Sequence, residues 1–505
     1  MKEEVKDQSK KKMPAIKIIS IIIWAISLAV SVCLIYLINK LNVVPNKFFI
    51  GITLLIGAVE LIALLIILLK KKGKVLISII DIALIAIIAA ESFASVKVKS
   101  LQGFVESNLK SGTATSVYSI ITSATSSITS TNEMSNKEIH YINSEDGDNK
   151  SKLTQKITST IENANLIEET DQISAMTDVT KNDDYILIAN SGLIDLMNSI
   201  DYDYESKIKV IETFTLDLND SENEKNTTID GIAEDAAGST TDTTKSFIVY
   251  FSGIDTRSGT LPSKSLTDSN IIIAVNPNTK NILLVHVPRD YYVQVHGTTG
   301  LKDKFTHSGI IGGINLSKAT LEDVFGIEIP YYIRANFNSV PALVDAIGGI
   351  NIYNDQDHTI KCNYKGYEFT PGWNYNVDGD KAFAFAHERY AYKEGDRHRG
   401  ENQEQVITRV IEKMSSSTEL LKNYDSILKA MTGTFETNFT YNNISSFIKM
   451  QLDDMAEWNV ETYNVDGDGK MDYTASYPKQ KLYVMYPDYS TVETAKEKIN
   501  ELLGE

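Results

Sequence analysis

Acidic and arginine side chains flank two apolar segments in the second half of the chain. Asp268 lies just before the segment 271–276 (IIIAVN), and Arg289 and Asp290 lie just after the segment 282–287 (ILLVHV). A short, turn-rich connection joins the two segments, which predicts a β-hairpin. The hairpin would place Asp268 beside Arg289 and Asp290, although Asp268 and Arg289 are 21 positions apart in the sequence.

A third apolar segment, 247–251 (FIVYF), is followed by Asp255 and Arg257. If it runs parallel to 282–287, Asp255 reaches the same edge of the sheet. Ligands of open α/β sheets gather at the carboxyl ends of strands. Mg²⁺ is commonly held by one or two carboxylates together with substrate phosphates. Asp255 and Asp268 beside arginines therefore predict a site for Mg²⁺ and an anionic ligand.

A second group of polar residues follows farther along the chain. Arg389 lies at helical spacing from the apolar residues of 382–386, so a helix would carry it on an apolar stripe, where an unpaired charge is costly. Arg397, Arg399 and Gln403 come next. One arginine alone is usually a solvated charge or part of a structural salt bridge. Several of them meeting the two acids favour a phosphate site, because guanidinium groups hold phosphate oxygens in a bidentate way.

Strand and helix patterns alternate around these residues, with hairpins among them. They predict an α/β fold in which helices cover a mixed sheet. The expected strands are 247–251, 271–276, 282–287, 331–333 and 350–353, and the expected helices are 314–325, 339–347, 377 onward and 401–414. Upstream, the Ser/Thr-rich region contains strand-like segments at 185–189 and 208–214, which predict a small α/β accessory module without a catalytic site.

The first hundred residues are apolar and predict three transmembrane helices. The uncharged segment 18–38 is followed by 48–69, which contains Glu60, and by 75–96, which contains Asp81 and Glu91. Six lysines precede the first segment and four lie between the second and third, whereas the other short loop has two. The positive-inside rule then places the N-terminus in the cytoplasm and the large C-terminal part outside.

These patterns divide the chain into five parts. We expect a cytoplasmic tail (1–17), three transmembrane helices (18–96), an extracytoplasmic accessory domain (97–218), a linker (219–244) and a catalytic domain (245–505). The net charge of −17 and the predicted location disfavour nucleic-acid binding. The two cysteines exclude a disulfide framework, because Cys33 falls inside an apolar segment.

Several strings of residues occur in the order of a known family. They are GIDTR, SLTDSNIIIAVNPNTK, HVPRDYYV, KFTHSGIIGG, GIEIPYYIRANF, VDAIGGINIY, FAFAHERY and GDRHRGENQ, between about 245 and 411. Each string alone is a weak signature of the family, but all of them in this order are specific for it. The chain resembles the LytR-CpsA-Psr family, and most of all its capsule-associated branch.

The resemblance implies an extracytoplasmic phosphotransferase. Such an enzyme would take a glycopolymer, such as capsular polysaccharide, from a polyprenyl diphosphate in the lipid bilayer and attach it to peptidoglycan, and capsule export or polymerase proteins are possible further partners. By resemblance, Asp255 and Asp268 match the magnesium ligands. The expected diphosphate contacts are Arg257, Arg289, Arg389, Arg397, Arg399 and Gln403, and the expected catalytic residues are Arg289, Arg389 and Asp290.

Two residues depart from the family pattern, and other functions stay open. Leu266 stands where an arginine is usual, and His387 replaces the first arginine of an RERY string, so both remove positive charge from the rim of the site. One alternative is a polyprenyl-diphosphate hydrolase, with water as the acceptor. Another is a non-catalytic protein that binds lipid-linked polymer and regulates capsule assembly. The predicted topology and acidity disfavour a transcription regulator.

Overall fold

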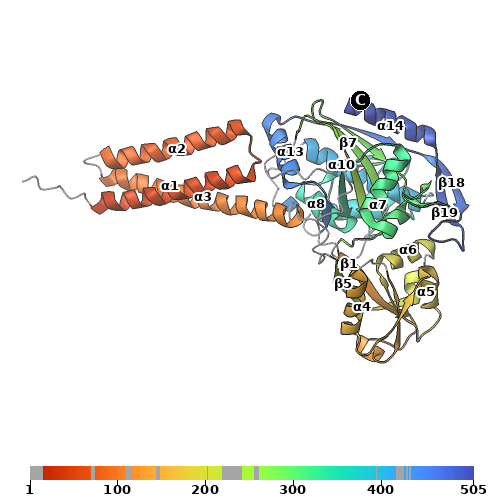
Figure 1. The fold of residues 1–505 in the computed structure, drawn as a ribbon. Helices are drawn as coiled ribbons and strands as arrows, with labels where there is room; N and C mark the ends of the chain where they lie inside the picture. Colours follow the sequence, from red (N-terminus) through yellow and green to blue (C-terminus); the bar gives the residue numbers. More distant parts are fainter. Residues whose placement is uncertain are drawn as a thin grey trace, which may run out of the picture. The chain divides into compact units, whose positions relative to one another are not determined.

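The structure is a computed structural model in which two units can be distinguished (Figure 1). The first unit comprises the N-terminal helices and helix α13 (Tyr441–Asp454). The second comprises most of the remaining chain. The described residues are 15–69, 74–109, 115–143, 148–201, 203–218, 242–254, 261–393, 395–416, 426–427, 430 and 434–504.

The first unit contains three helices that are long and apolar enough to cross a membrane. They are α1 (Ala15–Leu41), α2 (Asn46–Leu69) and α3 (Lys74–Leu109). Their most apolar stretches have mean hydropathies of 2.8, 2.9 and 2.3. The three predicted apolar helices are therefore present, and each is longer than the apolar segment that predicted it.

Polar side chains meet between these helices. Three hydroxyls of α1 donate to three acids of α2 and α3: Ser20 to Asp81 (2.9 Å), Ser27 to Glu60 (2.6 Å) and Ser31 to Glu91 (2.7 Å). Glu60 and Asp81 thus use different serines. Such pairs satisfy polar groups that would otherwise face hydrocarbon, and they favour a helix–helix contact.

The accessory module is a five-stranded sheet with helices on both faces. Its strand order is β3-β2-β4-β1-β5, and β2, β3 and β4 are parallel. The strands are β1 (Thr115–Ser123), β2 (Glu138–Ile142), β3 (Asn165–Glu169), β4 (Ile186–Asn190) and β5 (Ile208–Asp217). Helix α4 (Asp148–Thr160) packs on one face, and α5 (Gln172–Asp178) and α6 (Gly192–Ile200) pack on the other.

The larger domain is built on a six-stranded sheet, and the sheet is mixed, as the sequence predicted; the expected strand at 350–353 instead forms a separate two-stranded sheet. Its order is β16-β11-β6-β7-β8-β17. The strands are β6 (Phe247–Ile254), β7 (Ser269–Asn276), β8 (Asn281–His286), β11 (Tyr331–Asn336), β16 (Phe435–Thr437) and β17 (Asn459–Asn464). Strand β7 is antiparallel to both β6 and β8, so β6 and β8 run parallel to each other. The ends of β6 and β8 therefore lie at the same edge of the sheet, as the sequence predicted.

Helices cover both faces of this sheet. Helices α7 (Ser308–Phe325) and α14 (Tyr489–Leu503) pack on the face that carries Val285, in a cluster of buried hydrophobic residues. His286 points to the opposite face, where Thr408 of α10 (Asp396–Ser416) lies 3.4 Å away. Helix α8 (Val340–Ala346) contacts α9 (Gly379–His387), which in turn contacts α10.

The predicted helix through Arg389 ends earlier than expected. Helix α9 stops at His387, and Glu388 adopts extended backbone angles (φ −72°, ψ 131°). The carbonyl of Phe385, which a continuing helix would pair with the amide of Arg389, accepts hydrogen bonds from Glu388 N (3.2 Å) and Asn402 Nδ2 (3.0 Å). The placement of Arg389 on an apolar helical stripe is therefore wrong.

The accessory module and the larger domain share a hydrophobic cluster. Leu266 is 8% exposed and packs with buried residues of α5, α6 and the accessory sheet, together with Ile310 of α7. Gly309 approaches the same segment so closely that a Cβ there would lie 2.3 Å from the carbonyl oxygen of Ser265. The segment before Asp268 is thus tightly packed on both sides.

Candidate functional site

The β7–β8 hairpin brings two predicted site residues into contact. Ile271 pairs with His286, and the ladder continues outward with a bond from Val287 N to Asn270 O of 2.9 Å. At the open end, Arg289 Nη1 donates to Asp268 Oδ1 at 2.6 Å. Asp268 is 7% exposed, so this ion pair is shielded from water.

The neighbouring strand points toward the same end of the sheet. Gly253 of β6 pairs with Ser269 of β7, and its carbonyl accepts a hydrogen bond from Asp268 N at 2.9 Å. Strand β6 ends at Ile254. The predicted residues Asp255 and Arg257 follow directly in the sequence but lie outside the described residues.

Asp290 is held by two cations. Its Oδ1 pairs with Lys304 Nζ, and its Oδ2 lies 4.0 Å from Nε of Arg289. Burial by itself would raise the pKa of Asp290, but Lys304 and Arg289 outweigh burial and hold that pKa below its usual value. Asp290 is therefore an ionised carboxylate that helps to orient Arg289.

A cavity of about 230 Å³ opens beside these residues. Its lining includes one arginine, Arg289, and five carboxyl side chains: Asp268, Asp290, Glu401, Glu404 and Asp466. An anionic ligand would be repelled by such an excess of acids unless a cation accompanied it. This composition favours a ligand that combines negative phosphates with a divalent cation.

Two residues that the sequence interpretation missed also line this cavity. His286 Nδ1 lies 3.4 Å from Glu404 Oε2, and their side chains are 7% and 16% exposed. Burial lowers the pKa of His286 to about 4. Burial, together with the nearby charge of Glu401, raises the pKa of Glu404 well above its usual value. Glu404 follows Gln403 directly, but nothing in the sequence pattern showed that it would face the cavity.

Arg389, Arg399 and Gln403 are not among the described residues that line this cavity, although Arg399 and Gln403 directly adjoin the lining residues Gly400 and Glu404 in the sequence. Arg389 stacks on Tyr390, with its guanidinium carbon 4.7 Å from the ring centroid, and its Nη2 donates to the Tyr390 hydroxyl at 2.6 Å. Gln403 is 1% exposed, and its Nε2 has no hydrogen-bond partner among the described residues. The side chain of Arg397 lies outside the described residues.

The two departures from the family pattern have structural counterparts. Leu266 fills the junction with the accessory module, so its apolar character serves packing. The imidazole of His387 stacks on Phe383 with ring centroids 3.9 Å apart, and its Nδ1 donates to the carbonyl of Phe383 at 3.0 Å. His387 is thus engaged within its own helix.

The donor set at the sheet edge fits a partly protein-bound magnesium ion. Within the described residues, no three His, Cys, Asp or Glu side chains are grouped closely enough to hold a metal ion by themselves. Asp268 supplies one buried carboxylate, and Asp255, the other expected ligand, lies outside the described residues. Mg²⁺ commonly takes one or two carboxylates and completes its shell with water and substrate phosphates.

Curated relatives resemble this chain over the same region. A polyisoprenyl-teichoic acid–peptidoglycan teichoic acid transferase TagU from Enterococcus faecalis is 31% identical over 234 residues, which are 46% of this chain and 74% of that protein. The TagU of Bacillus anthracis is 34% identical over 206 residues, which are 41% of this chain and 65% of that protein. The match thus spans about two thirds of the Bacillus relative.

Solved structures also match the region. Bacillus subtilis TagV is 26% identical, with a TM-score of 0.43 and coverage of 52% of this chain and 98% of that one. The protein gbs0355 from Streptococcus agalactiae is 22% identical, with a TM-score of 0.43 and coverage of 52% and 89%. The family model described as the LytR_cpsA_psr family matches residues 209–486, more than half of the sequence. The chain belongs to the LytR-CpsA-Psr family.

Proposed function

We propose that this protein transfers a glycopolymer from a polyprenyl diphosphate to peptidoglycan. Its family membership supports this function, and so do the relatives, whose names describe transfer of polyisoprenyl-linked teichoic acid to peptidoglycan. The observation that carries the proposal is the buried contact of 2.6 Å between Arg289 and Asp268 at the mouth of an acid-lined cavity. We further propose that the polymer is a capsular polysaccharide, because the sequence most resembles the capsule-associated branch of the family.

Arg289 would bind the diphosphate. Pro288 and the end of β8 fix its backbone, its Nη1 donates to Asp268 at 2.6 Å, and Asp290 Oδ2 lies 4.0 Å from its Nε. A preorganised guanidinium can stabilise negative charge that develops on phosphate oxygens without reorienting during the reaction. Arg389, Arg399 and Gln403 remain proposed diphosphate contacts.

Glu404 is the proposed proton acceptor. In the transfer, the oxygen of an acceptor hydroxyl forms a bond to phosphorus, and the bond to the polyprenyl phosphate breaks, leaving its electron pair on that phosphate. The hydroxyl proton would pass to the ionised form of Glu404. The raised pKa makes this carboxylate a stronger base than an ordinary one, and the carboxylate forms only as the pH rises through that pKa. His286 stays neutral beside Glu404, so it does not form an ion pair with the Glu404 carboxylate.

Asp268 and Asp255 would hold Mg²⁺. When bound, the ion would neutralise negative charge on the diphosphate. It would also compensate the negative charge of the acidic residues that line the cavity. The attack breaks an existing diphosphate, so the reaction needs no ATP. This agrees with the proposed location, in which three crossings place the large domain outside the cell membrane.

The test is a transfer assay with the detergent-solubilised full chain, polyprenyl-diphosphate-linked polymer and peptidoglycan. We expect polymer to become covalently bound to peptidoglycan, EDTA to abolish the reaction and Mg²⁺ to restore it. Release of free polymer with no attachment would instead support the hydrolase. Binding of lipid-linked polymer without turnover at any Mg²⁺ concentration would overturn the enzymatic function.

The proposed metal site can be tested separately from turnover. Calorimetric titration with Mg²⁺ should show weakened binding in Asp268→Asn and in Asp255→Asn, because each removes one carboxylate ligand. Asp323→Asn is a suitable control, since Asp323 lies on α7 and pairs with His296 at 2.8 Å. Equal Mg²⁺ affinity in the two site variants and the wild type would contradict the assignment.

A further inference from the structure

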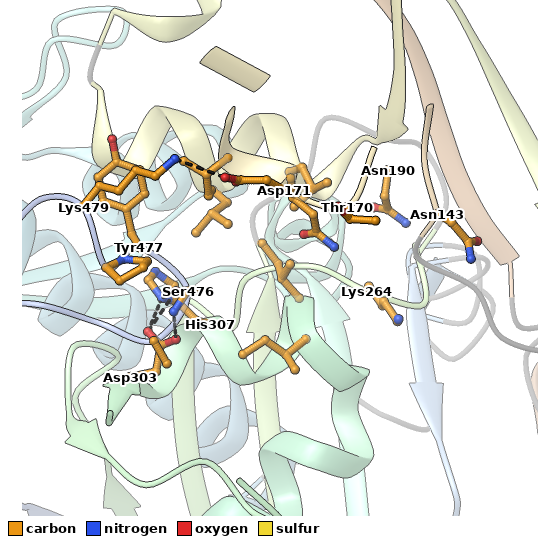
Figure 2. Close-up of a pocket in the computed structure, with 18 residues that line it drawn as sticks. Asn143, Thr170, Asp171, Asn190, Lys264, Asp303, His307, Ser476, Tyr477 and Lys479 are labelled. Atoms are coloured by element: carbon orange, nitrogen blue, oxygen red, sulfur yellow. Dashed lines mark hydrogen bonds and ion pairs between the residues drawn. The ribbon is translucent and has the colours of Figure 1, made fainter. Parts of the chain in front are cut away.

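A second cavity lies between the accessory module and the larger domain, within the same unit (Figure 2). Its volume is about 740 Å³, in the range of small-molecule sites. The accessory side contributes Asn143, residues 170–173 and Asn190. The other side contributes α7 and the loop 475–479.

The topology of the accessory sheet points to a binding site at this position. Asn143 follows β2, Thr170 follows β3, and Asn190 ends β4, so three parallel strands all finish at the cavity. The chain leaves β2 toward α4 on one face and leaves β4 toward α6 on the other. Adjacent parallel strands whose connections diverge in this way form a crevice at their carboxyl ends, where ligands of open α/β sheets bind.

Two buried polar atoms of the lining have no protein partner among the described residues. Asn190 is 3% exposed, and its Oδ1 accepts from Gly192 N at 3.0 Å, which leaves Nδ2 as a free donor. His307 is 1% exposed, and its Nδ1 lies 2.6 Å from Asp303 Oδ1, so Nε2 is left without a partner. Figure 2 shows both side chains at the cavity. Buried polar groups are normally hydrogen-bonded, so a bound ligand would supply the partners that these two atoms lack.

The lining selects a neutral ligand rich in hydroxyl groups. Lys264 and Lys479 are balanced by Asp171 and Asp303, and no arginine is among the described residues that line the cavity. Apolar side chains of α5, α6 and α7 form the remaining wall, and Tyr477 adds an aromatic ring. A polyprenyl chain would leave the buried polar atoms unsatisfied, and a phosphate would lack a net positive partner.

We propose that this cavity binds a saccharide unit. Hydroxyl groups of a sugar both donate and accept, so they suit Asn190 Nδ2 and His307 Nε2, and the C–H faces of a sugar ring suit the apolar wall. The segment 264–268 links the two cavities: Lys264 lines this one and Asp268 lines the diphosphate cavity. Four residues span at most about 14 Å, so a sugar near the diphosphate could reach it.

The inference rests on the proposed function for the source of the sugar. The saccharide would belong either to the lipid-linked polymer or to the glycan strand of peptidoglycan. Both sources present the same chemistry to the cavity, and binding experiments with each can tell them apart. The accessory module would then select the sugar that is transferred or the sugar that accepts it.

The test uses calorimetric titration of the detergent-solubilised full chain with two probes. One probe is the peptidoglycan disaccharide N-acetylglucosaminyl-N-acetylmuramic acid with its lactyl carboxyl capped as an amide, as it is in peptidoglycan, so that the probe is neutral. The other is a set of oligosaccharides released by mild acid from the lipid-linked polymer of the source cells. We expect one of the two to bind. The one that binds identifies the source, and failure of both would overturn the proposal.

Three variants locate the site. Asn190→Asp keeps the acceptor for Gly192 N and removes the free donor, so saccharide affinity should fall about tenfold or more. Ile311→Trp should block the cavity rim without disturbing a core, because Ile311 is 42% exposed. Leu301→Trp is its matched control, also 42% exposed but outside the lining. Unchanged affinity in folded Ile311→Trp would show that the sugar binds elsewhere.

The variant Arg289→Lys separates this inference from the proposed function. It should lose transfer and keep saccharide affinity, because Arg289 does not line the second cavity. If the wild type binds the saccharide but never transfers polymer, the proposed function fails and the saccharide site stands. If transfer proceeds with equal efficiency in the wild type and Ile311→Trp and neither binds the probes, the saccharide site fails and the proposed function stands.

Discussion

Arg289 Nη1 lies 2.6 Å from Asp268 Oδ1 at the open end of the β7–β8 hairpin. The contact joins a guanidinium expected to bind phosphate with a carboxylate expected to bind Mg²⁺. Without ligand, each group neutralises the other, which keeps two buried charges paired. A diphosphate–magnesium ligand would supply a partner to both groups at once.

Replacement of Arg289 by lysine should abolish most of the transfer activity. Lysine keeps the positive charge beside Asp268 but loses the bidentate geometry, so the rate should fall roughly a hundredfold, or about 3 kcal/mol of transition-state stabilisation. The melting temperature should change little, because the ion pair survives. Turnover is measured beside the thermal midpoint, and near-normal turnover in the folded variant would exclude Arg289 from phosphate binding.

Replacement of Arg389 by lysine tests the second group of predicted residues. We expect a loss of transfer comparable with that of Arg289→Lys if Arg389 turns from Tyr390 to the diphosphate. Tyr390→Phe is the matched control: it removes the hydroxyl that accepts from Arg389 Nη2 and keeps the ring under the guanidinium. Full activity in Arg389→Lys would mean that stacking on Tyr390 is the whole role of this arginine.

The pair of His286 and Glu404 should make stability depend on pH in two opposite directions. Because the pKa of Glu404 is raised in the folded state, its contribution to the free energy of unfolding is fully present below the ordinary carboxyl pKa of 4.5. This contribution is lost as the pH rises through the folded-state pKa. Because burial lowers the pKa of His286 to about 4, its contribution to the free energy of unfolding is fully present above pH 6.5, the ordinary pKa of histidine. This contribution is lost as the pH falls toward 4.

Each half of this dependence can be removed separately. Glu404→Gln should raise the melting temperature at neutral and alkaline pH, with the gap to the wild type closing toward acid. His286→Gln should reduce the loss of stability between about pH 6 and about pH 4. Thermal midpoints across this range are the measurement. Parallel pH profiles for the wild type and Glu404→Gln would show that Glu404 is not protonated in the folded protein.

The proposed topology can be tested with engineered thiols. The native Cys362 is unsuitable, because it is 1% exposed and burial raises its pKa to about 12, so we expect no labelling by maleimide in the folded protein. In a Cys33→Ser background, Leu301→Cys offers an exposed position in the larger domain. A membrane-impermeant maleimide should label it in wall-permeabilised cells and should not label Ser9→Cys. The opposite labelling pattern would reverse the orientation.

The sequence predicted the sheet edge well because its signals are local. Two apolar strands and a short turn determine the hairpin register, and that register alone places Asp268 opposite Arg289. It did not reveal that Glu404 faces the same cavity, because that depends on how α10 packs across the sheet. The early end of α9 likewise depends on Asn402, a residue of another helix.

The Ser/Thr-rich region shows a different limit. Strand β1 lies within it and pairs with both β4 and β5, yet its composition gave little sign of a buried strand. Its hydroxyls are satisfied by tertiary partners: Ser119 Oγ lies 2.8 Å from Ser191 Oγ, and Ser116 Oγ lies 3.1 Å from Ser263 Oγ. Polar residues can fill a buried strand when partners come from elsewhere in the fold.

Leu266 allows a prediction that separates packing from phosphate binding. If the apolar side chain of Leu266 packs between the accessory module and the larger domain, Leu266→Arg should bury a charge among the residues around it. The free energy of unfolding should then fall by about 3 kcal/mol or more. Leu266→Met keeps the volume and should cost less than about 1.5 kcal/mol. If the position instead belongs to the phosphate site, Leu266→Arg should fold normally and bind polyprenyl phosphate more tightly. Denaturant unfolding beside lipid-phosphate titration decides between them, and we expect the loss of stability because the segment around Leu266 is enclosed by the accessory module and by Gly309.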